Sequence, residues 1–494
     1  MIKNQNIFFK KEVSIFACLF LFLGHFAWNQ TSPVQNATTP SPEAIEKYQH
    51  VITQTYPHQA SLKGSESLGR LTAFDAYTLV LQWTITTALR GNESTYHDYL
   101  KATETIEEHL NSLDHGPFPL FVLADLHLQK ALIQTHFNDE LSAIWSFKRA
   151  VELINHCQED YPAFLPVKKT SGIIYILLGS VPNEYQWLLS ILGWEGDINM
   201  GLAQLKQLTN DPVWGLEASI YYYITQSYLL DNYDLALQEM SQKTVEYPNS
   251  ELLRYIYAAL LLKNGKAQSV IKLPSGATPV PQFYYMKGEA FLRKGAYHQA
   301  IANYNLFLNK CQGSDLIKDS HYKLFLCYYL GGDEQKAADH LKRAGETGST
   351  RVESDRYASR QLSQPFVNKP LMQVRLATDG GFYKRADSLL NINISMFNPK
   401  ETAEYYYRKA RLCHETAQIE KALIWYQTAI RASGNQTWYF GPNAALKSGE
   451  IYIQQGEEDK AKEYLKLTLS YKNHEYKRSI DRKAKALLNQ LGFK

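Results

Sequence analysis

The feature that most constrains the fold of this 494-residue chain is a small or β-branched residue that returns at a nearly regular interval. From its second occurrence onward, the intervals are 34, 30, 37, 49, 36 and 39 residues. A period of about 34 residues is typical of helical hairpin repeats. A single hairpin leaves one apolar side uncovered, so hairpins with this period must stack on one another. The recurring residues are Ala143, Ala236, Val270, Ala300, Ala337, Ala386, Ala422 and Ala461.

Residues 282–308, QFYYMKGEAFLRKGAYHQAIANYNLFL, show the repeat most completely. Small residues at two fixed positions let the two helices of a hairpin cross closely, and aromatic residues fill the gap to the next hairpin. This arrangement is the tetratricopeptide pattern, with Phe307 in place of the usual last small residue. The sequence therefore predicts an all-α fold, an α-solenoid of tetratricopeptide-type helical hairpins. The matching residues here are Tyr284, Gly288, Phe291, Gly295, Ala300 and Tyr304.

The composition along the chain divides it into four segments. Residues 1–28 place three lysines before the apolar run VSIFACLFLFLGHFAW, which predicts a signal peptide. Cys18 lies in a loose lipobox, so a lipid anchor is the alternative to simple cleavage. Residues 29–60 begin with a stretch rich in Pro, Ser, Thr and Asn, which predicts a flexible linker. Residues 61–215 are expected to form an N-terminal helical domain with one divergent repeat, and residues 216–494 the tetratricopeptide repeat array.

Two parts of the array are expected to depart from the regular hairpin. Pro274, Pro279 and Pro281 follow Val270 closely and should end the second helix of that unit early, because proline disrupts a helix interior. The interval from Ala337 to Ala386 is long and contains GETGSTRVESDRYASRQLSQP, which is expected to be a surface excursion.

Residues 172–205 form a signature rich in glycine within the N-terminal domain. Gly193 and Gly196 suit a tight turn between helices, and Asp197 is placed to cap the following helix. Gly172 and Gly179 are seven residues apart and share one helix face, which permits close approach of a neighbouring helix. Structural packing is the favoured interpretation, and a ligand pocket around Trp187 and Trp194 is the alternative.

This signature, which also includes Pro182, resembles the eukaryotic tetratricopeptide repeat protein 39 and inclusion-body-clearance family. Trp194 stands where that family usually has Phe. The resemblance implies a helical-repeat scaffold or binding protein with no catalytic residues to carry over. The eukaryotic members lack an export signal, so the chain is expected to be an exported bacterial relative. The matching residues are Gly172, Leu178, Ser180, Pro182, Leu188, Leu189, Gly193, Gly196, Asp197, Gly201, Leu202 and Leu205.

Charge and motif content argue against several classes of function. Removing residues 1–27 takes away three lysines and one glutamate from 52 basic and 49 acidic side chains, which leaves 49 and 48. A nearly neutral chain has no overall field for nucleic acid, so none is predicted as a partner. The sequence has no HExxH, GxSxG or GxxxxGKS motif and no cysteine pair with metal-ligand spacing. We therefore predict no enzyme activity, no cofactor, no metal site and no membrane span in the mature chain.

Aligning the repeats brings out a column of tyrosines and two arginines on the first helices, at positions that face the groove of such a solenoid. These residue types dominate protein binding surfaces because they bury a large area and keep a polar tip. Tyrosine is also frequent at these positions in tetratricopeptide repeats generally, so structural packing is the alternative. The candidate groove-binding residues are Tyr221, Tyr228, Tyr255, Tyr285, Tyr322, Tyr329, Arg375, Tyr407 and Arg411.

These observations lead to two hypotheses of function. The first is a non-catalytic exported scaffold, an adaptor or assembly factor, that binds a protein or peptide partner in its concave groove. The second is a cell-surface protein with helical repeats that binds a glycan or nutrient. In a Gram-negative host the chain is expected to be periplasmic or associated with the outer membrane, and otherwise secreted. The sequence leaves the oligomeric state open.

Overall fold

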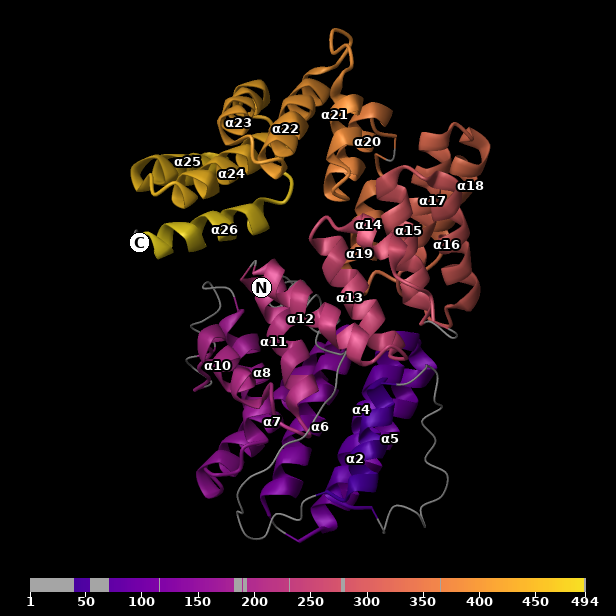
Figure 1. Ribbon diagram of the computed structural model, residues 1–494, viewed down its shortest axis with the longest axis vertical. Coiled ribbons are helices and arrows are strands. Elements are labelled where there is room, and N and C mark those ends of the chain that lie inside the picture. The colour runs from indigo at the N-terminus through magenta and orange to yellow at the C-terminus, as the bar shows by residue number, and fades with distance from the viewer. Residues whose placement is uncertain are drawn as a thin grey trace.

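The computed structural model describes residues 40–53, 71–114, 116–181, 189, 193–230, 232–276, 280–364 and 366–492. Within these ranges every regular element is a helix, and successive helices stack into a curved solenoid (Figure 1). The N-terminal half contains α2 (Pro42–Thr53), α4 (Ala73–Arg90), α5 (Glu93–Ser112), α6 (Pro117–His136), α7 (Glu140–Asp160), α8 (Val167–Gly179) and α10 (Ile198–Leu208).

The repeat array follows as seven hairpins, with one extra helix, α19 (Glu353–Gln361), inserted and a final helix, α26 (Lys477–Gln490), below the last hairpin (Figure 1). The paired helices are α11 (Gly215–Leu229) with α12 (Tyr233–Glu246), α13 (Glu251–Lys263) with α14 (Ala267–Lys272), α15 (Pro281–Lys294) with α16 (Tyr297–Lys310), α17 (Ile317–Gly331) with α18 (Glu334–Glu346), α20 (Lys369–Asp379) with α21 (Tyr383–Leu390), α22 (Pro399–Glu415) with α23 (Ile419–Ser433), and α24 (Phe440–Gln454) with α25 (Glu458–Ser470).

The recurring small residues mark the second helix of each hairpin, as the spacing predicts. All eight are buried, with exposed fractions of 6% or less, and they lie in α7, α12, α14, α16, α18, α21, α23 and α25. In the α15–α16 hairpin, a Cβ atom added to Gly288 would lie 2.8 Å from a ring carbon of Tyr304. The close crossing of the two helices therefore depends on the small side chains, and the predicted α-solenoid of tetratricopeptide-type hairpins is confirmed.

The two irregular units differ in how well they were predicted. The helix α14 spans six residues and ends at Lys272, before Pro274, as expected. The predicted surface excursion is wrong in part, because its residues 353–361 form α19, which packs on α17. Ala358 and Asp355 of this helix are fully buried. Asp355 and Ala358 are three positions apart in ESDRYASRQ, so they share one face of a short helix. The charged residues around them obscure this spacing in the sequence.

The predicted flexible linker over residues 29–60 is also wrong in part, because residues 42–53 form α2, which packs on α4 and α13. Tyr48 fixes this helix: its ring packs edge-on against Phe74 and Tyr77, and its hydroxyl donates to Glu217 Oε2 at 3.0 Å. Residues 29–39 and 54–60 of the linker, like the predicted signal peptide, lie outside the described residues.

Glu217 belongs to a buried ionic cluster in the N-terminal half. The ammonium group of Lys169 lies 2.9 Å from Asp125 Oδ1 and 3.0 Å from Glu217 Oε1, and Tyr77 donates to Glu217 Oε2 at 2.6 Å. Burial raises the pKa of Glu217 against the lowering effect of Lys169. One apolar core continues from Ala44 to Ala290 around this cluster, so the core is not interrupted at the predicted domain boundary of residues 215 and 216.

The glycine-rich signature packs as the sequence predicts. A Cβ atom added to Gly172 would lie 2.9 Å from the carbonyl oxygen of Gly201, so α8 and α10 touch through their backbones. Gly193 has a φ of 68°, and the Asp197 carboxylate accepts hydrogen bonds from the first free amides of α10, Asn199 N and Met200 N. Trp194 packs edge-on against Phe147 with 5.5 Å between the ring centroids. Pro182, Trp187 and Leu188 lie outside the described residues.

The N-terminal half also contacts the middle of the array directly. Arg351 donates to the carbonyl oxygen of Gly91 at 2.5 Å, and its Nε lies 3.0 Å from Asp315 Oδ1. His136 Nε2 lies 2.9 Å from the other oxygen of the same aspartate. Gly91 and Arg351 are separated by 260 residues in the sequence, so these contacts hold distant parts of the chain together.

Among the described residues, no helix combines the length and the apolar character that a membrane span requires.

We expect Gly201→Ala to lower the free energy of unfolding of the full chain by about 2–3 kcal/mol, because the new methyl group would collide with the Gly172 carbonyl. Chemical unfolding followed by circular dichroism measures this change. Gly345→Ala is the matched control, since a Cβ atom there meets nothing within 4 Å, and it should preserve or slightly raise stability. Equal stability of the two variants would contradict the backbone contact between α8 and α10.

Candidate functional site

Four of the predicted groove tyrosines lie in the interior, and this corrects the expectation that they face a partner. Tyr221, Tyr285, Tyr322 and Tyr407 are each exposed by 4% or less. Their rings fill the space between neighbouring hairpins, and the hydroxyl of Tyr285 donates to Asp319 Oδ2 at 2.6 Å. A ring that is covered on both faces has no free surface to offer a ligand. The alternative interpretation, structural packing, therefore holds for these four residues.

The other predicted residues keep part of their surface, in two separate places. Tyr228 and Tyr255 lie on α11 and α13, and the Lys263 ammonium group sits 4.7 Å from the centre of the Tyr228 ring. Tyr329, Arg375 and Arg411 lie on α17, α20 and α22 in the C-terminal half. The structure thus divides the five residues between two parts of the array, and a binding role for any of them stays a prediction.

Arg375 and Arg411 form a charged network that joins three helices of the C-terminal half. Arg375 donates to the hydroxyl of Tyr357 on α19 at 2.9 Å, and its Nε lies 3.7 Å from Asp379 Oδ2. The same carboxylate accepts from Arg411 at 2.6 Å through its other oxygen. This network ties α19, α20 and α22 together.

Arg408 extends the network to the last hairpin. Its guanidinium donates twice to Glu404 Oε1, at 3.0 and 2.7 Å, and to the hydroxyl of Tyr439 at 2.8 Å. Asn443 on α24 donates to the hydroxyl of Tyr407 at 2.6 Å. The first helices α20, α22 and α24 are neighbours in the stack, so these bonds join successive hairpins.

The proton affinities in this network follow from burial and from the arginines. Burial by itself would raise the pKa of Asp379, but Arg411 and Arg375 hold it at about 2. Burial raises the pKa of Tyr439 to about 12, although Arg408 and Arg375 oppose that rise. At neutral pH the aspartate is therefore ionised and the tyrosine is neutral, so the arginines have their full set of acceptors.

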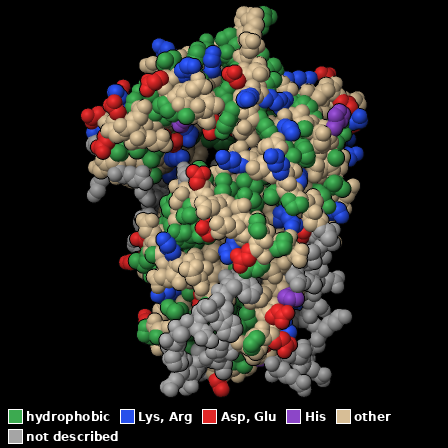
Figure 2. All heavy atoms as spheres, in the orientation of Figure 1, with side chains coloured by type: hydrophobic (Ala, Val, Ile, Leu, Met, Phe, Trp, Pro, Cys, Tyr) green, Lys and Arg blue, Asp and Glu red, His purple; other side chains and the backbone are tan. Residues whose placement is uncertain are grey.

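A hollow of about 550 Å³ opens next to this network. Figure 2 shows the surface hollowed between the C-terminal hairpins and the centre of the molecule, beside the start of α26. Phe366 is 66% exposed and Tyr476 is 40% exposed at this hollow, so two large rings face solvent. The lining residues are Arg360, Gln361, Ser363, Gln364, Phe366, Val367, Asn368, Asn398, Lys400, Glu401, Glu404, Glu475 and Tyr476.

The walls of the hollow are braced by short polar contacts. Asn368 donates to Glu401 Oε1 at 3.0 Å, and Lys400 Nζ lies 3.3 Å from Glu475 Oε1. The Phe366 ring packs edge-on against Phe325 and Tyr329, which fixes its direction while leaving one face open. The site can therefore offer exposed aromatic surface beside mixed charges. In the described residues no group of three or more potential ligands surrounds a metal position.

Several of these residues were missed at the level of sequence. Asp379 follows Arg375 by four residues, a helical spacing that predicts an ion pair and could have indicated the network. Tyr357 lies in the segment expected to be a surface excursion. Phe366 and Tyr476 lie outside the hairpin helices, where the repeat pattern gives no information about position.

Comparisons with known proteins agree on the repeat and go no further. Residues 403–436 and 443–474 match the tetratricopeptide repeat family, and these stretches are the last two hairpins, which carry Tyr407 and Arg411. No curated protein matches the chain.

Similar solved structures include a human IFIT1 dimer with PPP-AAAA, at 14% identity, covering 88% of this chain and 96% of that chain, with a TM-score of 0.31. Another is the APC/C hetero-tetramer Cut9–Hcn1, at 11% identity, covering 85% and 84%, with a TM-score of 0.26. A third is the P58(IPK) TPR domain, at 15% identity, covering 85% and 99%, with a TM-score of 0.21. Such low identities and TM-scores indicate nothing about what this chain binds.

We expect Asp379→Asn to lower the free energy of unfolding at neutral pH by about 1–2 kcal/mol, because Arg375 and Arg411 lose a charged acceptor. The folded pKa of about 2 lies below the unfolded value of about 3.9. The stabilisation by this carboxylate is therefore present above pH 4 and is lost as the pH falls towards 2. Urea unfolding across this pH range measures the effect, with Asp387→Asn on the exposed side of α21 as the control. Equal stability of Asp379→Asn and the control at pH 7 would contradict the network.

Proposed function

We propose that this chain is a non-catalytic scaffold that binds a segment of a protein partner in the hollow beside α26. The observation that carries the proposal is the pair of exposed rings, Phe366 and Tyr476, at the mouth of a hollow of about 550 Å³. Large rings flanked by polar groups are typical of the residues that contribute most to protein binding. Phe366 packs edge-on against Phe325 and Tyr329, and Tyr476 packs edge-on against Tyr439, so both rings are held in place before a partner arrives.

The size and chemistry of the hollow support a short extended segment. Its volume lies within the range of about 300–1,000 Å³ that is usual for ligand sites, and its polar lining offers both donors and acceptors. The carboxylates Glu401 and Glu475 and the cations Arg360 and Lys400 line the same space. A peptide backbone has donors and acceptors to match, and one or two apolar side chains of the segment would cover the rings.

The cellular setting is part of the proposal. The basic and apolar start of the sequence supports export, with a periplasmic, outer-membrane or secreted location according to the host. The signature around Gly193 and Asp197 supports a relationship to the tetratricopeptide repeat protein 39 family. In such a setting the chain would act as an adaptor or assembly factor for other exported proteins.

The test is a selection of displayed random 12-residue peptides against the full chain. We expect peptides that bind the native chain, and we expect Phe366→Ala with Tyr476→Asn to weaken them by about 10- to 30-fold, or about 1.4–2 kcal/mol. Asparagine is chosen because residue 476 has a φ of 59°, which asparagine tolerates well. Fluorescence anisotropy with the selected peptides measures the affinity.

Ile424→Ala is the matched control, since this residue is exposed on a second helix away from the hollow. The control should bind as the native chain does. Peptides that bind the doubly substituted chain with unchanged affinity would contradict the proposed site. The predicted alternative, a glycan ligand, would use the same exposed rings, and competition by oligosaccharides in this assay would favour it.

A further inference from the structure

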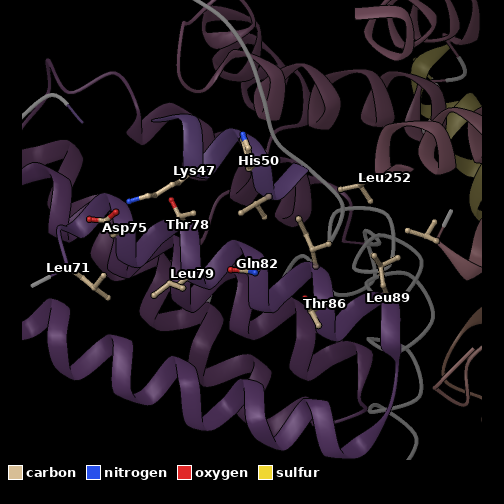
Figure 3. Close-up of a pocket in the computed structure, with 13 residues that line it drawn as sticks. Lys47, His50, Leu71, Asp75, Thr78, Leu79, Gln82, Thr86, Leu89 and Leu252 are labelled. Atoms are coloured by element: carbon tan, nitrogen blue, oxygen red, sulfur yellow. The ribbon is translucent and has the colours of Figure 1, made fainter. Parts of the chain in front are cut away.

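A second hollow, of about 430 Å³, lies in the N-terminal half between α2, α4 and α13 (Figure 3). Its floor is one face of α4 from Asp75 to Leu89 together with Leu71 just before that helix, and its walls come from α2, Leu252 and Val280. This volume also lies in the usual range for small-ligand sites. It is separate from the C-terminal hollow and shares no lining residue with it.

The inner end of this hollow is aliphatic. Ile85, Leu89, Leu252 and Val280 line it, and each of these side chains is almost fully buried. The described lining contains no Phe, Tyr or Trp ring, so a flat aromatic ligand would gain little stacking there. A flexible aliphatic chain needs only apolar surface to cover, and this end supplies it.

The middle of the hollow contains two polar side chains that can bond to a ligand. Gln82 and Thr86 both line it, on the same face of α4 (Figure 3). Solvent in the hollow reaches these groups, and a ligand that displaces the solvent must offer them hydrogen-bond partners. An uncharged ester, amide or hydroxyl group supplies such partners.

The outer end is charged, and its lysine is already paired. Lys47 Nζ lies 2.8 Å from Glu43, His50 lies 3.7 Å from Glu46, and Asp75 accepts hydrogen bonds from Thr72. Figure 3 shows the Lys47 ammonium group directed towards Asp75. An anionic ligand would therefore meet two carboxylates and a lysine that already has a partner.

We propose that this hollow binds a neutral, single-chain amphiphile. Its aliphatic chain would lie against Ile85, Leu89 and Leu252, and its uncharged polar head would bond to Gln82 and Thr86. The chemical class is that of fatty-acid esters and amides. This site is independent of the protein-binding hollow beside α26, so either can be present without the other.

The test is a calorimetric titration of the full chain with 1-lauroylglycerol, kept below its micelle concentration. We expect saturable binding of one molecule per chain. Thr86→Val keeps the side-chain shape without the hydroxyl and should weaken binding by about 5- to 10-fold, while Thr105→Val on the exposed side of α5 should leave it unchanged. Leu79→Trp should fill the hollow and abolish binding, because Leu79 lines it and is half-buried, which leaves room for the larger ring.

Laurate, which carries a negative charge on the same chain length, should bind at least tenfold more weakly than the ester. The proposal is overturned if the native chain shows no saturable binding of 1-lauroylglycerol. It is equally overturned if Thr86→Val binds as tightly as the native chain, or if laurate binds as tightly as the ester. Thermal unfolding of each variant checks that it is folded. If Leu79→Trp does not fold, the affinity of Thr86→Val for 1-lauroylglycerol decides between the outcomes.

Discussion

The close crossing of two helices at a small side chain is the interaction on which the rest of this structure depends. Ala300, Ala337, Ala422 and Ala461 are each at most 1% exposed, and a larger residue at any of them would push the helices of its hairpin apart. Because each hairpin covers its neighbour, the first helices are enclosed while the second helices keep a broad exposed side. In α18, for example, only Ala337 and Ala344 are buried. The stacking of the hairpins therefore determines which side chains can reach the hollow beside α26.

A second constraint comes from contacts between distant segments. Arg351 and Asp315 of the array hold the turn at Gly91 and the end of α6, so the N-terminal half rests on the middle of the array. The C-terminal hairpins are held differently, through the arginines around Asp379. The guanidinium groups of these arginines donate hydrogen bonds to neighbouring helices and so hold those helices together. The free surface is left to Phe366 and Tyr476, which lie between hairpins.

Features of the fold could be predicted from the sequence where a local constraint on the backbone requires a particular type of residue. The alanine register, the early end of α14 and the backbone contact at Gly172 all follow from small side chains or proline, whose effects are local. Four tyrosines of the predicted column are buried because the repeat period gives the direction of a side chain relative to its own helix and not the depth at which the next hairpin covers it. Tyr285 and Tyr322 point inward as expected, but the neighbouring hairpin closes over them. The helices α2 and α19 were missed because their burial depends on partners far away in the sequence, such as Glu217 for Tyr48.

Hydrogen–deuterium exchange on the full chain carrying Ala422→Leu tests the stacking most directly. Ala422 is fully buried in α23, and the leucine side chain would separate α22 from α23. If hairpins depend on their neighbours, protection should fall in α22 and α23 and also in the adjoining α20, α21, α24 and α25, while α4, α6 and α8 keep theirs. Loss of protection confined to α22 and α23, or spread evenly through the whole chain, would contradict an array held together by contacts between nearest neighbours.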